Sequence, residues 1–283
     1  MADVEGGTPM NKTLFITGAS SGIGRATAHF FHDRGWNVVA TMRSPDNAAE
    51  LAGMDRVLVA HLDVLDHESI SSARDAALKR FGSVDVLLNN AGYGAYGPLE
   101  AFSMERIERQ FGTNVIGLLA VTKAFLPHFR TNRQGVIVNI SSIGGQMTFP
   151  LGTLYHGTKF AVEGLSESLH YELEPFGVRV KIVEPGMIKT DFGGRSFDFC
   201  NDESLAEYQG TIQQLFAYWG NSPSSPSEPT VVADVIWTAA HDDTGTLRFR
   251  AGADAEMLLD SRKAQDDQTF IGGLKSQLGF VPE

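Results

Sequence analysis

The chain has 283 residues, a length that suits one large α/β domain able to bury a sizeable core. Hydrophobic residues make up 42% and charged residues 20% of the sequence, and no apolar run reaches the roughly 18 residues of a transmembrane helix. The net charge of −11 argues against nucleic acid or an anionic membrane as a partner.

The single cysteine, Cys200, excludes an internal disulfide and fits a reducing compartment, so we expect a cytoplasmic protein. Residues 1–10 lack the basic-then-apolar layout of a signal peptide and are expected to form a flexible tail. Residues 11–283 are expected to form a single domain.

The first predicted element is a buried strand in the apolar run 14–16, and a helix is predicted over 22–34. The glycine-rich turn between them has the context of a dinucleotide-binding turn. Glycines let the backbone approach a pyrophosphate, and the helix N-terminus offers free N–H groups to it. An ordinary tight turn is the alternative interpretation. The sequence of the turn is Thr17-Gly18-Ala19-Ser20-Ser21-Gly22-Ile23-Gly24.

Apolar runs then alternate with longer segments of helical period. This alternation predicts βαβ units with right-handed crossovers, and therefore an α/β, Rossmann-type, doubly wound parallel sheet of about seven strands with helices on both faces. The Ser- and Pro-rich stretch 221–229 is expected to be a loop. Further strands are predicted at 38–41, 57–62, 84–88, 136–140, 178–183 and 247–250, and further helices at 66–81, 104–130 and 153–176.

Tyr155 and Lys159 are four residues apart, so on a helix their side chains share a face. A nearby ammonium favours the phenolate and is expected to lower the pKa of the tyrosine from its reference value of about 10. Such a tyrosine can donate a proton to a carbonyl oxygen or accept one from an alcohol. Ser142, thirteen residues before the tyrosine, is expected to hold that oxygen. Because the Tyr–Lys spacing is common by chance, this interpretation depends on the other motifs.

These motifs, taken together and in order, resemble the short-chain dehydrogenase/reductase family over roughly residues 12–195. Within the family the chain most resembles the hydroxysteroid- and retinol-dehydrogenase-like reductases. The matching motifs are the glycine turn, Asn89-Asn90-Ala91-Gly92, Asn114 in Thr113-Asn114-Val115, Ser142, Tyr155 with Lys159, and Pro185-Gly186 followed by Thr190.

The resemblance implies an oxidoreductase that transfers a hydride between NADP(H) and a bulky hydrophobic ketone or secondary alcohol. It assigns the catalytic roles to Asn114, Ser142, Tyr155 and Lys159, with Asn114 holding a water that relays protons to the lysine. A polar group that repairs a helix kink is the alternative for Asn114. The predicted cofactor contacts are Gly18, Ser20, Ser21, Gly22, Ile23, Gly24, Arg43, Asp63, Val64, Asn90, Ala91, Gly92, Tyr155, Lys159, Pro185, Gly186, Ile188 and Thr190.

The choice between NADP(H) and NAD(H) depends on the end of the second predicted strand. A carboxylate at this point bonds the ribose hydroxyls of the unphosphorylated cofactor, and the corresponding residue here is Met42. The next residue, Arg43, can pair with a 2′-phosphate, and the Ser20 hydroxyl can add a hydrogen bond. We therefore predict NADP(H). Asp63 is expected to contact the adenine, with a helix cap before 66–81 as the alternative.

Aromatic and apolar residues on the expected rim predict a bulky hydrophobic substrate, covered by a segment at about 187–229. Packing of the cover or a subunit contact is the alternative for the later aromatics. His156 is expected to be structural or to line the pocket, because one helical step turns it away from the target of Tyr155. No His or Cys cluster has metal-ligand spacing, so no metal is expected. The predicted substrate contacts are Tyr93, Ser142, Phe149, Tyr155, Met187 and Phe192.

Two other function classes remain open: an NADP-binding sensor without turnover, and a nucleotide-sugar epimerase or dehydratase. The intact Ser142, Tyr155 and Lys159 argue against the first, and the short C-terminal region argues against the second. The apolar positions of the helices predicted at 104–130 and 153–176 exceed what one sheet face covers, so a homodimer or homotetramer is expected.

Overall fold

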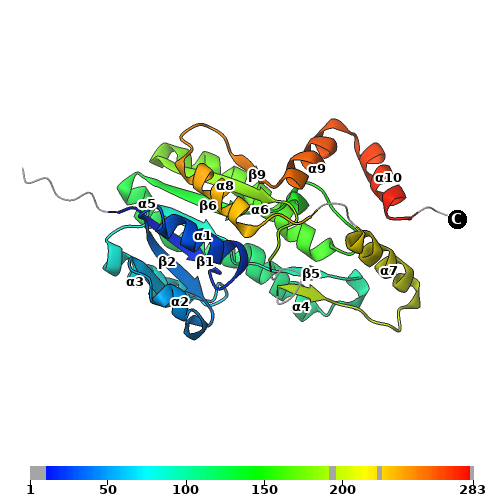
Figure 1. The fold of residues 1–283 in the computed structure, drawn as a ribbon, viewed down its shortest axis with the longest axis horizontal. Coiled ribbons are helices and arrows are strands. Elements are labelled where there is room, and N and C mark those ends of the chain that lie inside the picture. The colour runs from blue at the N-terminus through cyan, green and yellow to red at the C-terminus, as the bar shows by residue number, and fades with distance from the viewer. Residues whose placement is uncertain (1–10, 191–195, 222–224, 281–283) are drawn as a thin grey trace, which may run out of the picture.

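The computed structural model describes residues 11–190, 196–221 and 225–280. Its main sheet has seven parallel strands in the order β3-β2-β1-β4-β6-β7-β9, with helices on both faces (Figure 1). The predicted doubly wound α/β fold is therefore confirmed, whereas the predicted tail, residues 1–10, lies outside the described residues. The strands are β1 (Thr13–Thr17), β2 (Asn37–Met42), β3 (Val57–His61), β4 (Val86–Asn89), β6 (Gly135–Ile140), β7 (Val178–Pro185) and β9 (Arg248–Ala251).

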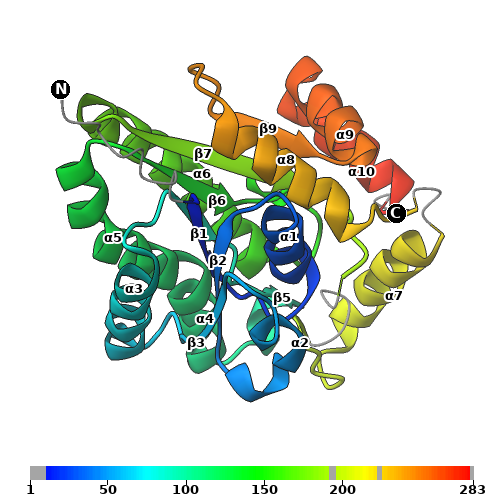
Figure 2. The same ribbon diagram turned by 60° about the vertical axis from the view of Figure 1, so that its left-hand side comes forward.

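The central strands are mostly apolar and buried because both faces of the sheet are covered. Successive side chains point to opposite faces, so Leu14 and Ile16 pack in one buried cluster and Phe15 in the other. Helices α1 (Gly22–His32) and α8 (Pro229–His241) lie side by side over the first face (Figure 2). Helices α3 (His67–Phe81), α5 (Leu118–Asn132) and α6 (Thr153–Leu173) cover the second.

The strand order reverses between β1 and β4. The chain runs outward from β1 to β3 and then returns to pair β4 with the other side of β1. In an open parallel sheet, ligands bind outside the carboxyl ends of the strands at such a switch point. This topology places the glycine turn after β1 beside the segment that follows β4.

The predicted helix 104–130 is helical throughout, but it is not one regular α-helix. The structure divides it into α4 (Met104–Phe111), a π-helical segment, η3 (Gly112–Gly117), and α5. Wide turns of this kind frequently occur at functional sites. The Asn114 side chain lies in the π-helical segment, where it bonds to the backbone of Tyr93. The prediction of one regular helix was wrong because these tertiary contacts have no local sequence signal.

Several elements beyond the main sheet were not predicted. β5 (Gly94–Tyr96) and β8 (Phe197–Phe199) form a two-stranded parallel sheet. Helix α7 (Ala206–Gly220) follows β8, and the chain ends in α9 (Ala253–Ala264) and α10 (Asp267–Gln277). The amide of Gln214 on α7 donates to the carbonyl oxygen of Gly279 at 3.2 Å, so the end of α10 lies against α7. These elements lie beside the carboxyl edge of the main sheet (Figure 1).

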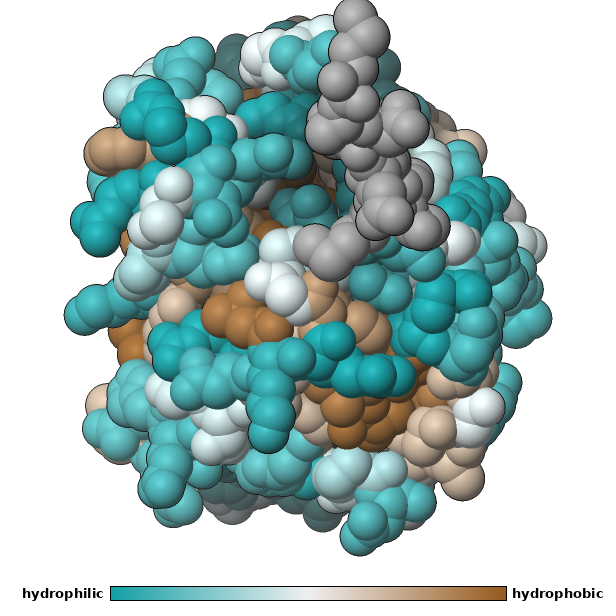
Figure 3. Space-filling view, turned by 90° about the vertical axis from the view of Figure 1, so that its left-hand side faces the viewer, coloured by the Kyte–Doolittle hydropathy of each residue, from teal (hydrophilic) through white to brown (hydrophobic). Residues whose placement is uncertain are grey.

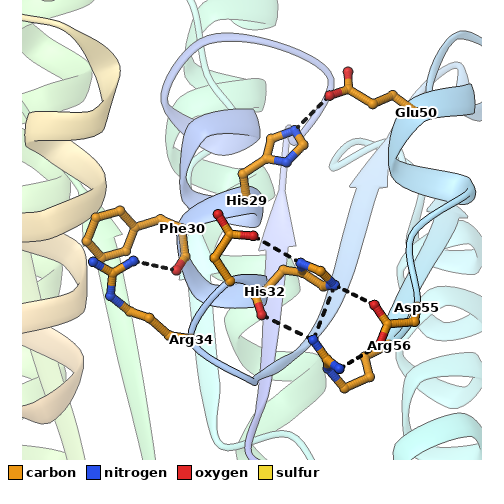
Figure 4. A network of polar contacts seen from close by, with 8 residues as sticks. His29, Phe30, His32, Arg34, Glu50, Asp55 and Arg56 are labelled. Carbon is orange, nitrogen blue, oxygen red and sulfur yellow. Dashed lines mark hydrogen bonds and ion pairs between the residues drawn. The ribbon is translucent and has the colours of Figure 1, made fainter.

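A polar network ties the chain after β2 to helix α1 (Figure 4). His32 on α1 lies 2.9 Å from the carboxylate of Asp55, and Arg56 binds the same carboxylate at 2.5 Å. His29, one turn earlier, lies 3.4 Å from Glu50 on the short helix α2 (Ala49–Ala52). The network fixes the segment that carries Arg43 against the helix that begins at the glycine turn.

The surface on the side of α3 and α5, at the far end from α7 and α10, is largely hydrophilic with apolar patches near its middle (Figure 3). Within the described ranges, no helix combines the length and the apolar character needed to cross a bilayer.

Candidate active site

The glycine turn brings α1 close to the backbone at the end of β1. Gly18 has a φ of +71°, a left-handed conformation that favours glycine. A Cβ at Gly24 would lie 2.3 Å from the carbonyl oxygen of Gly18, so a side chain there would collide with the turn. Ser21 precedes α1 in an extended conformation, and within the described structure its side chain makes no capping hydrogen bond. The first N–H groups of α1 are therefore oriented to receive an anionic group such as a pyrophosphate.

Asn90 and Ala91, which follow β4, fix the glycine turn from the neighbouring strand. Their backbone N–H groups both donate to Oγ1 of Thr17 at 3.0 Å. The side-chain amide of Asn90 donates to the carbonyl oxygens of Thr17 and Gly18, each at 3.0 Å. The amide nitrogen of Asn90 is thus used to position the turn, a role that the motif alone did not indicate.

The segment after β7 meets the glycine turn. A Cβ on Gly22 would lie 3.3 Å from the side chain of Thr190, so these two predicted cofactor positions are neighbours. The backbone N–H of Met187 donates to the carboxylate of Asp254 on α9 at 2.6 Å, and its carbonyl oxygen accepts from the N–H of Ser227 at 2.9 Å. Both contacts anchor the segment that also holds Pro185, Gly186 and Ile188.

Met42 and Arg43 differ sharply in exposure. Met42 ends β2 with its side chain in the buried cluster under α1, so it offers nothing to a ribose. Arg43 is exposed, and among the described residues no acidic group pairs with its guanidinium. Ser20 is also exposed, at the tip of the glycine turn. Arg43 is therefore a cation at the carboxyl end of β2 that remains available to a ligand.

Asp63 and Val64 follow β3. The Asp63 carboxylate accepts from the backbone N–H of Leu65 at 3.0 Å and is partly exposed. The alternative role of Asp63 as a helix cap was wrong, because Asp66 caps α3 by accepting from the N–H of Glu68. Val64 is buried, with its side chain against the π-helical segment at Gly117.

Ser142, Tyr155 and Lys159 come together behind the carboxyl end of β6. Ser142 begins a short 3₁₀ turn, η4 (Ile143–Gly145), and accepts from the N–H of Gly144 at 3.0 Å. Tyr155 and Lys159 lie on successive turns of α6, both buried, with the lysine Nζ 5.8 Å from the centre of the tyrosine ring. The Lys159 ammonium donates to the carbonyl oxygen of Ile140 at 2.9 Å. The structure therefore brings the three predicted side chains into one site.

Burial governs the titration of this pair. It raises the pKa of Tyr155 to about 12, although a hydrogen bond with Ser142 acts in the opposite direction. This differs from the lowered pKa that the Tyr–Lys spacing predicted, because the sequence does not show how deeply the phenol is buried. Burial likewise lowers the pKa of Lys159 to about 8, opposed by the negative charge of Glu163. Near neutral pH the site thus holds a neutral phenol beside an ammonium.

Asn114 connects the π-helical segment to the site. Its Oδ1 accepts from the N–H of Tyr93 at 3.1 Å, and its Nδ2 donates to the Tyr93 carbonyl oxygen at 2.9 Å. The same Nδ2 lies 3.0 Å from Oγ1 of Thr158, between the two predicted catalytic residues of α6. Gln110, one turn earlier and missed by the sequence analysis, binds the backbone of Tyr93 and Ala95 in the same way. Its spacing of four residues from Asn114 was the available signal.

His156 holds the loop that carries Ser142. Its Nδ1 lies 3.0 Å from the carbonyl oxygen of Gly144, and its Nε2 accepts from the N–H of Phe149 at 3.0 Å. Burial lowers the pKa of His156 to about 4, although the hydrogen bond to Gly144 opposes this. The imidazole is therefore neutral at physiological pH and fixes the Ser142 loop, as expected for a structural histidine.

Aromatic side chains cover Tyr155 on one side. The Tyr96 ring lies 5.5 Å from that of Tyr155, centre to centre, and 5.4 Å from that of Phe197. Trp219 on α7 lies 5.6 Å from Tyr96 and 6.1 Å from Phe197 in edge-on contacts. We call Tyr96, Phe197 and Trp219 the aromatic wall. Elements that are distant in the sequence thus build one apolar surface beside the phenol.

The predicted substrate residues occupy different positions. Phe149 lies near His156 and Tyr218, with ring centres 6.2 Å and 6.5 Å away. Met187 is exposed on the segment after β7. Tyr93 packs in a separate cluster with Ala95, Phe102 and Leu154. Phe192 lies outside the described residues.

Comparisons with known proteins agree with this arrangement. Residues 12–200 match the short chain dehydrogenase family. An uncharacterised oxidoreductase of Schizosaccharomyces pombe is 43% identical over 239 residues, which are 84% of this chain and 100% of that protein. Retinol dehydrogenase 8 of Bos taurus is 38% identical over 217 residues, covering 74% of this chain and 68% of the relative.

Solved structures give the same result. A short-chain dehydrogenase from Streptomyces avermitilis superimposes with a TM-score of 0.80 at 36% identity, covering 95% of this chain and 98% of that one. The protein ElxO with NADP bound has a TM-score of 0.70 at 28% identity, covering 85% and 98%. A 3-ketoacyl-(acyl-carrier-protein) reductase from Brucella melitensis, complexed with NADH, has a TM-score of 0.70 at 27% identity, covering 85% and 97%. The chain belongs to the short-chain dehydrogenase family of NAD(P)-binding oxidoreductases.

Proposed function

We propose that the protein is an NADP(H)-dependent carbonyl reductase that acts on a bulky hydrophobic ketone, or in reverse on the secondary alcohol. The observation that carries this proposal is the position of Tyr155. Its phenol is buried, hydrogen-bonded with Ser142, next to the Lys159 ammonium and beside the aromatic wall. A neutral proton donor beside an apolar surface suits the reduction of an apolar carbonyl compound.

The residues at the carboxyl edge fit a dinucleotide. The close approach at Gly24 and the start of α1, where the Ser21 side chain makes no capping bond among the described residues, suit its pyrophosphate, and Thr190 lies next to this turn. Arg43 is the residue that we assign to the 2′-phosphate, because it is an exposed cation at the end of β2 where Met42 supplies no carboxylate. Asp63 and Val64 are assigned to the adenine side. These assignments support NADP(H) over NAD(H).

When bound, NADPH supplies a hydride to the carbonyl carbon of the substrate. Tyr155 donates its phenolic proton to the carbonyl oxygen, on which negative charge develops. The Ser142 hydroxyl donates a hydrogen bond to the same oxygen and fixes its position. Lys159 stabilises the phenolate by its charge and holds the ribose. Asn114 ties the backbone of Tyr93 to Thr158, the residue before the lysine. We assign to it the water that would return a proton to Lys159.

The substrate class follows from the aromatic wall. Tyr96, Phe197 and Trp219 pack against one another beside the phenol, and Phe149 and Tyr218 form a further ring contact next to His156. An apolar ring system or long alkyl chain would bury its surface against these side chains, whereas a small polar carbonyl compound would leave them hydrated.

The test is to follow NADPH absorbance with the purified protein and a panel of steroid ketones, long-chain ketones, retinal and small polar ketones. Oxidation of NADPH that requires an apolar carbonyl compound, and that is lost in Tyr155→Phe, supports the proposal. Turnover of none of these compounds, or equal turnover by the Tyr155→Phe variant, would contradict it.

We further propose that residues 11–283 act as one catalytic domain in a cytoplasmic homodimer or homotetramer. The unpaired thiol of Cys200 fits a reducing compartment. Large apolar side chains are exposed on adjoining parts of α4, η3 and α6, and such a surface suits an isologous contact between copies. They are Met104, Phe111, Ile116 and Phe160.

A further inference from the structure

Two buried carboxylates lie behind Lys159. Glu163 is on α6, one helical turn beyond the lysine, and its side chain is 5% exposed. Glu184 is on β7, immediately before Pro185, and is 0% exposed. Buried carboxylates are costly unless they are paired, so their retention at this position requires a physical explanation.

Arg248, on the edge strand β9, lies close to both carboxylates. Its Nε lies 2.9 Å from Glu163 Oε2 and 4.0 Å from Glu184 Oε1. The terminal nitrogen Nη2 of the same guanidinium binds the carboxylate of Glu167, which is 45% exposed, at 2.6 Å. Gln146, just after the Ser142 turn, donates its amide to Glu184. Oε1 of Glu163 and Oε2 of Glu184 are buried without a hydrogen-bond partner in the described parts of the chain.

One guanidinium cannot fully compensate these carboxylates. Burial, followed by the charge of Glu163, raises the pKa of Glu184 to about 7, against the opposing effects of Gln146, Arg248 and Arg250. The two carboxylates share this cation unequally. Glu163 has a direct ion pair with Arg248 at 2.9 Å, whereas Glu184 lies 4.0 Å from the same nitrogen.

The position of Glu163 relative to the active site is set by the helix. Tyr155, Lys159 and Glu163 follow one another at intervals of four residues on α6 and therefore share one face. Ser141 and Gly145, which flank the Ser142 turn, lie against the same region, since a Cβ on Gly145 would be 2.9 Å from Cγ of Glu163. The carboxylate is thus the anion nearest along the helix to an ammonium that burial disfavours.

We propose that Glu163 is a positioning residue for the reaction: from the next turn of α6, its carboxylate keeps Lys159 in the charged form, while Arg248 fixes that carboxylate from behind. This inference rests on the proposed function of Lys159 as the group that holds the ribose and stabilises the phenolate. The proposed effect of Glu163 is to stabilise the buried ammonium of Lys159, and this effect can be measured without following turnover.

The test is the pH dependence of Glu163→Gln. The amide keeps an oxygen for Arg248 but removes the negative charge one helical turn from Lys159. We measure kcat/KM for ketone reduction, and separately the dissociation constant of NADPH by quenching of protein fluorescence, from pH 6 to 10. Both should weaken as Lys159 loses its proton. We call this fall at high pH the alkaline limb. In Glu163→Gln the alkaline limb should move to lower pH by about one unit, so that at pH values above it kcat/KM is up to about tenfold lower than in wild type.

Glu167→Gln is the matched control, because Glu167 binds the same arginine from the same helix but faces solvent; its alkaline limb should stay at the wild-type pH. Glu163→Asp retains the charge, so its alkaline limb should lie near the wild-type pH. Glu163→Met has an apolar side chain of similar length, and it should reproduce the shift of the limb to lower pH if the glutamine variant does not fold. A folded Glu163→Gln or Glu163→Met with an unshifted limb, or an equal shift in Glu167→Gln, would overturn the inference. If wild-type protein binds NADPH but reduces no ketone, the proposed function is contradicted instead. The pH dependence of the NADPH dissociation constant would then still test the role of Glu163.

Discussion

The ring of Tyr96 lies over that of Tyr155 with their centres 5.5 Å apart and their planes inclined by 34°. This contact removes the phenol from water and contributes to the burial that raises its pKa to about 12. It also means that a substitution of Tyr155 alters the packing of Tyr96 unless the ring is retained. Under the proposed function, the two tyrosines therefore couple proton donation by Tyr155 to the aromatic wall.

Tyr155→Phe retains this ring contact and removes only the proton donor. We expect kcat for ketone reduction to fall by about 10²–10⁴-fold, the usual contribution of general acid catalysis. The dissociation constant of NADPH and the melting temperature should change little. A variant that retains most of the wild-type kcat would remove Tyr155 from its proposed role.

Arg43→Ala tests the cofactor assignment. Hydrogen bonds to charged groups contribute roughly 1.5–3 kcal/mol, so their loss should weaken NADPH binding by about ten- to a hundredfold. NADH has no 2′-phosphate, and its affinity should stay within about twofold of wild type. Arg130→Ala, at an exposed position of α5, controls for a general change in net charge. Equal weakening of both cofactors by Arg43→Ala, or a wild-type preference for NADH, would show that Arg43 is not the phosphate ligand.

Adding an acceptor for the ribose hydroxyls is less simple than the sequence suggested. The sequence places a carboxylate for NAD(H) at position 42, but the Met42 side chain packs in the core under α1. An aspartate introduced there would be buried, so its effect on cofactor choice must be separated from its effect on stability. The single substitution of Arg43 is therefore the cleaner measurement.

Glu184→Gln should change how stability depends on pH. The pKa of Glu184 is raised in the folded protein from its ordinary value of 4.5 to about 7, mainly by burial. Between these values the folded state binds more protons than the unfolded state, so the free energy of unfolding falls as pH rises through this window. The variant lacks this titration and should gain on the order of 1–3 kcal/mol relative to wild type above pH 7.

The measurement is urea-induced unfolding of wild type and Glu184→Gln at pH 5, 6, 7 and 8. The difference between the two free energies should grow with pH up to about 7 and then level off. Glu167→Gln, on the exposed side of the same arginine, should give a difference that does not vary with pH. A Glu184→Gln profile parallel to wild type would mean that Glu184 is ionised in the folded protein throughout this range.

Phe160→Glu tests the proposed oligomer. Phe160 is exposed on α6, and Phe111 of α4 lies in the same area, because its ring atom Cζ would be 3.5 Å from a Cβ on Gly157. A charge in an isologous contact is repeated by symmetry, so the substitution places two like charges together. Light scattering should show a dimer or tetramer for wild type and a monomer for the variant at micromolar concentration. Tyr171→Glu, farther along α6 and also exposed, is the control. A monomeric wild type would contradict the proposal.

The sequence was sufficient for the seven strands of the main sheet. Both faces of the inner strands are buried, which leaves apolar runs such as 14–16 in the sequence. Ser142, Tyr155 and Lys159 could be predicted because their spacing is local to one turn and one helix. β5 and β8 could not, since each has three residues and pairs with a partner about a hundred positions away, as Gly94 does with Phe197. Such short strands have no period of their own.

Burial accounts for the other differences between sequence and structure. The charge of Lys159 was visible in the sequence, but the depth of Tyr155 was not, and depth decides the direction of its pKa. Glu184 did leave a signal, because it is the one carboxylate of β7 and stands directly before Pro185. Without the position of Arg248, that signal could not be distinguished from an ordinary polar residue at a strand end.

The aromatic wall is built outside the seven-stranded sheet. Tyr96 belongs to the two-stranded sheet, and Trp219 to α7, whereas Ser142, Tyr155 and Lys159 are held by β6 and α6. Under the proposed function, replacing residues of α7 such as Trp219 should therefore change the surface beside Tyr155 and leave β6 and α6 in place. The preferred carbonyl compound should then change without loss of the proton donor, provided that Tyr96 and its contact with Tyr155 are retained.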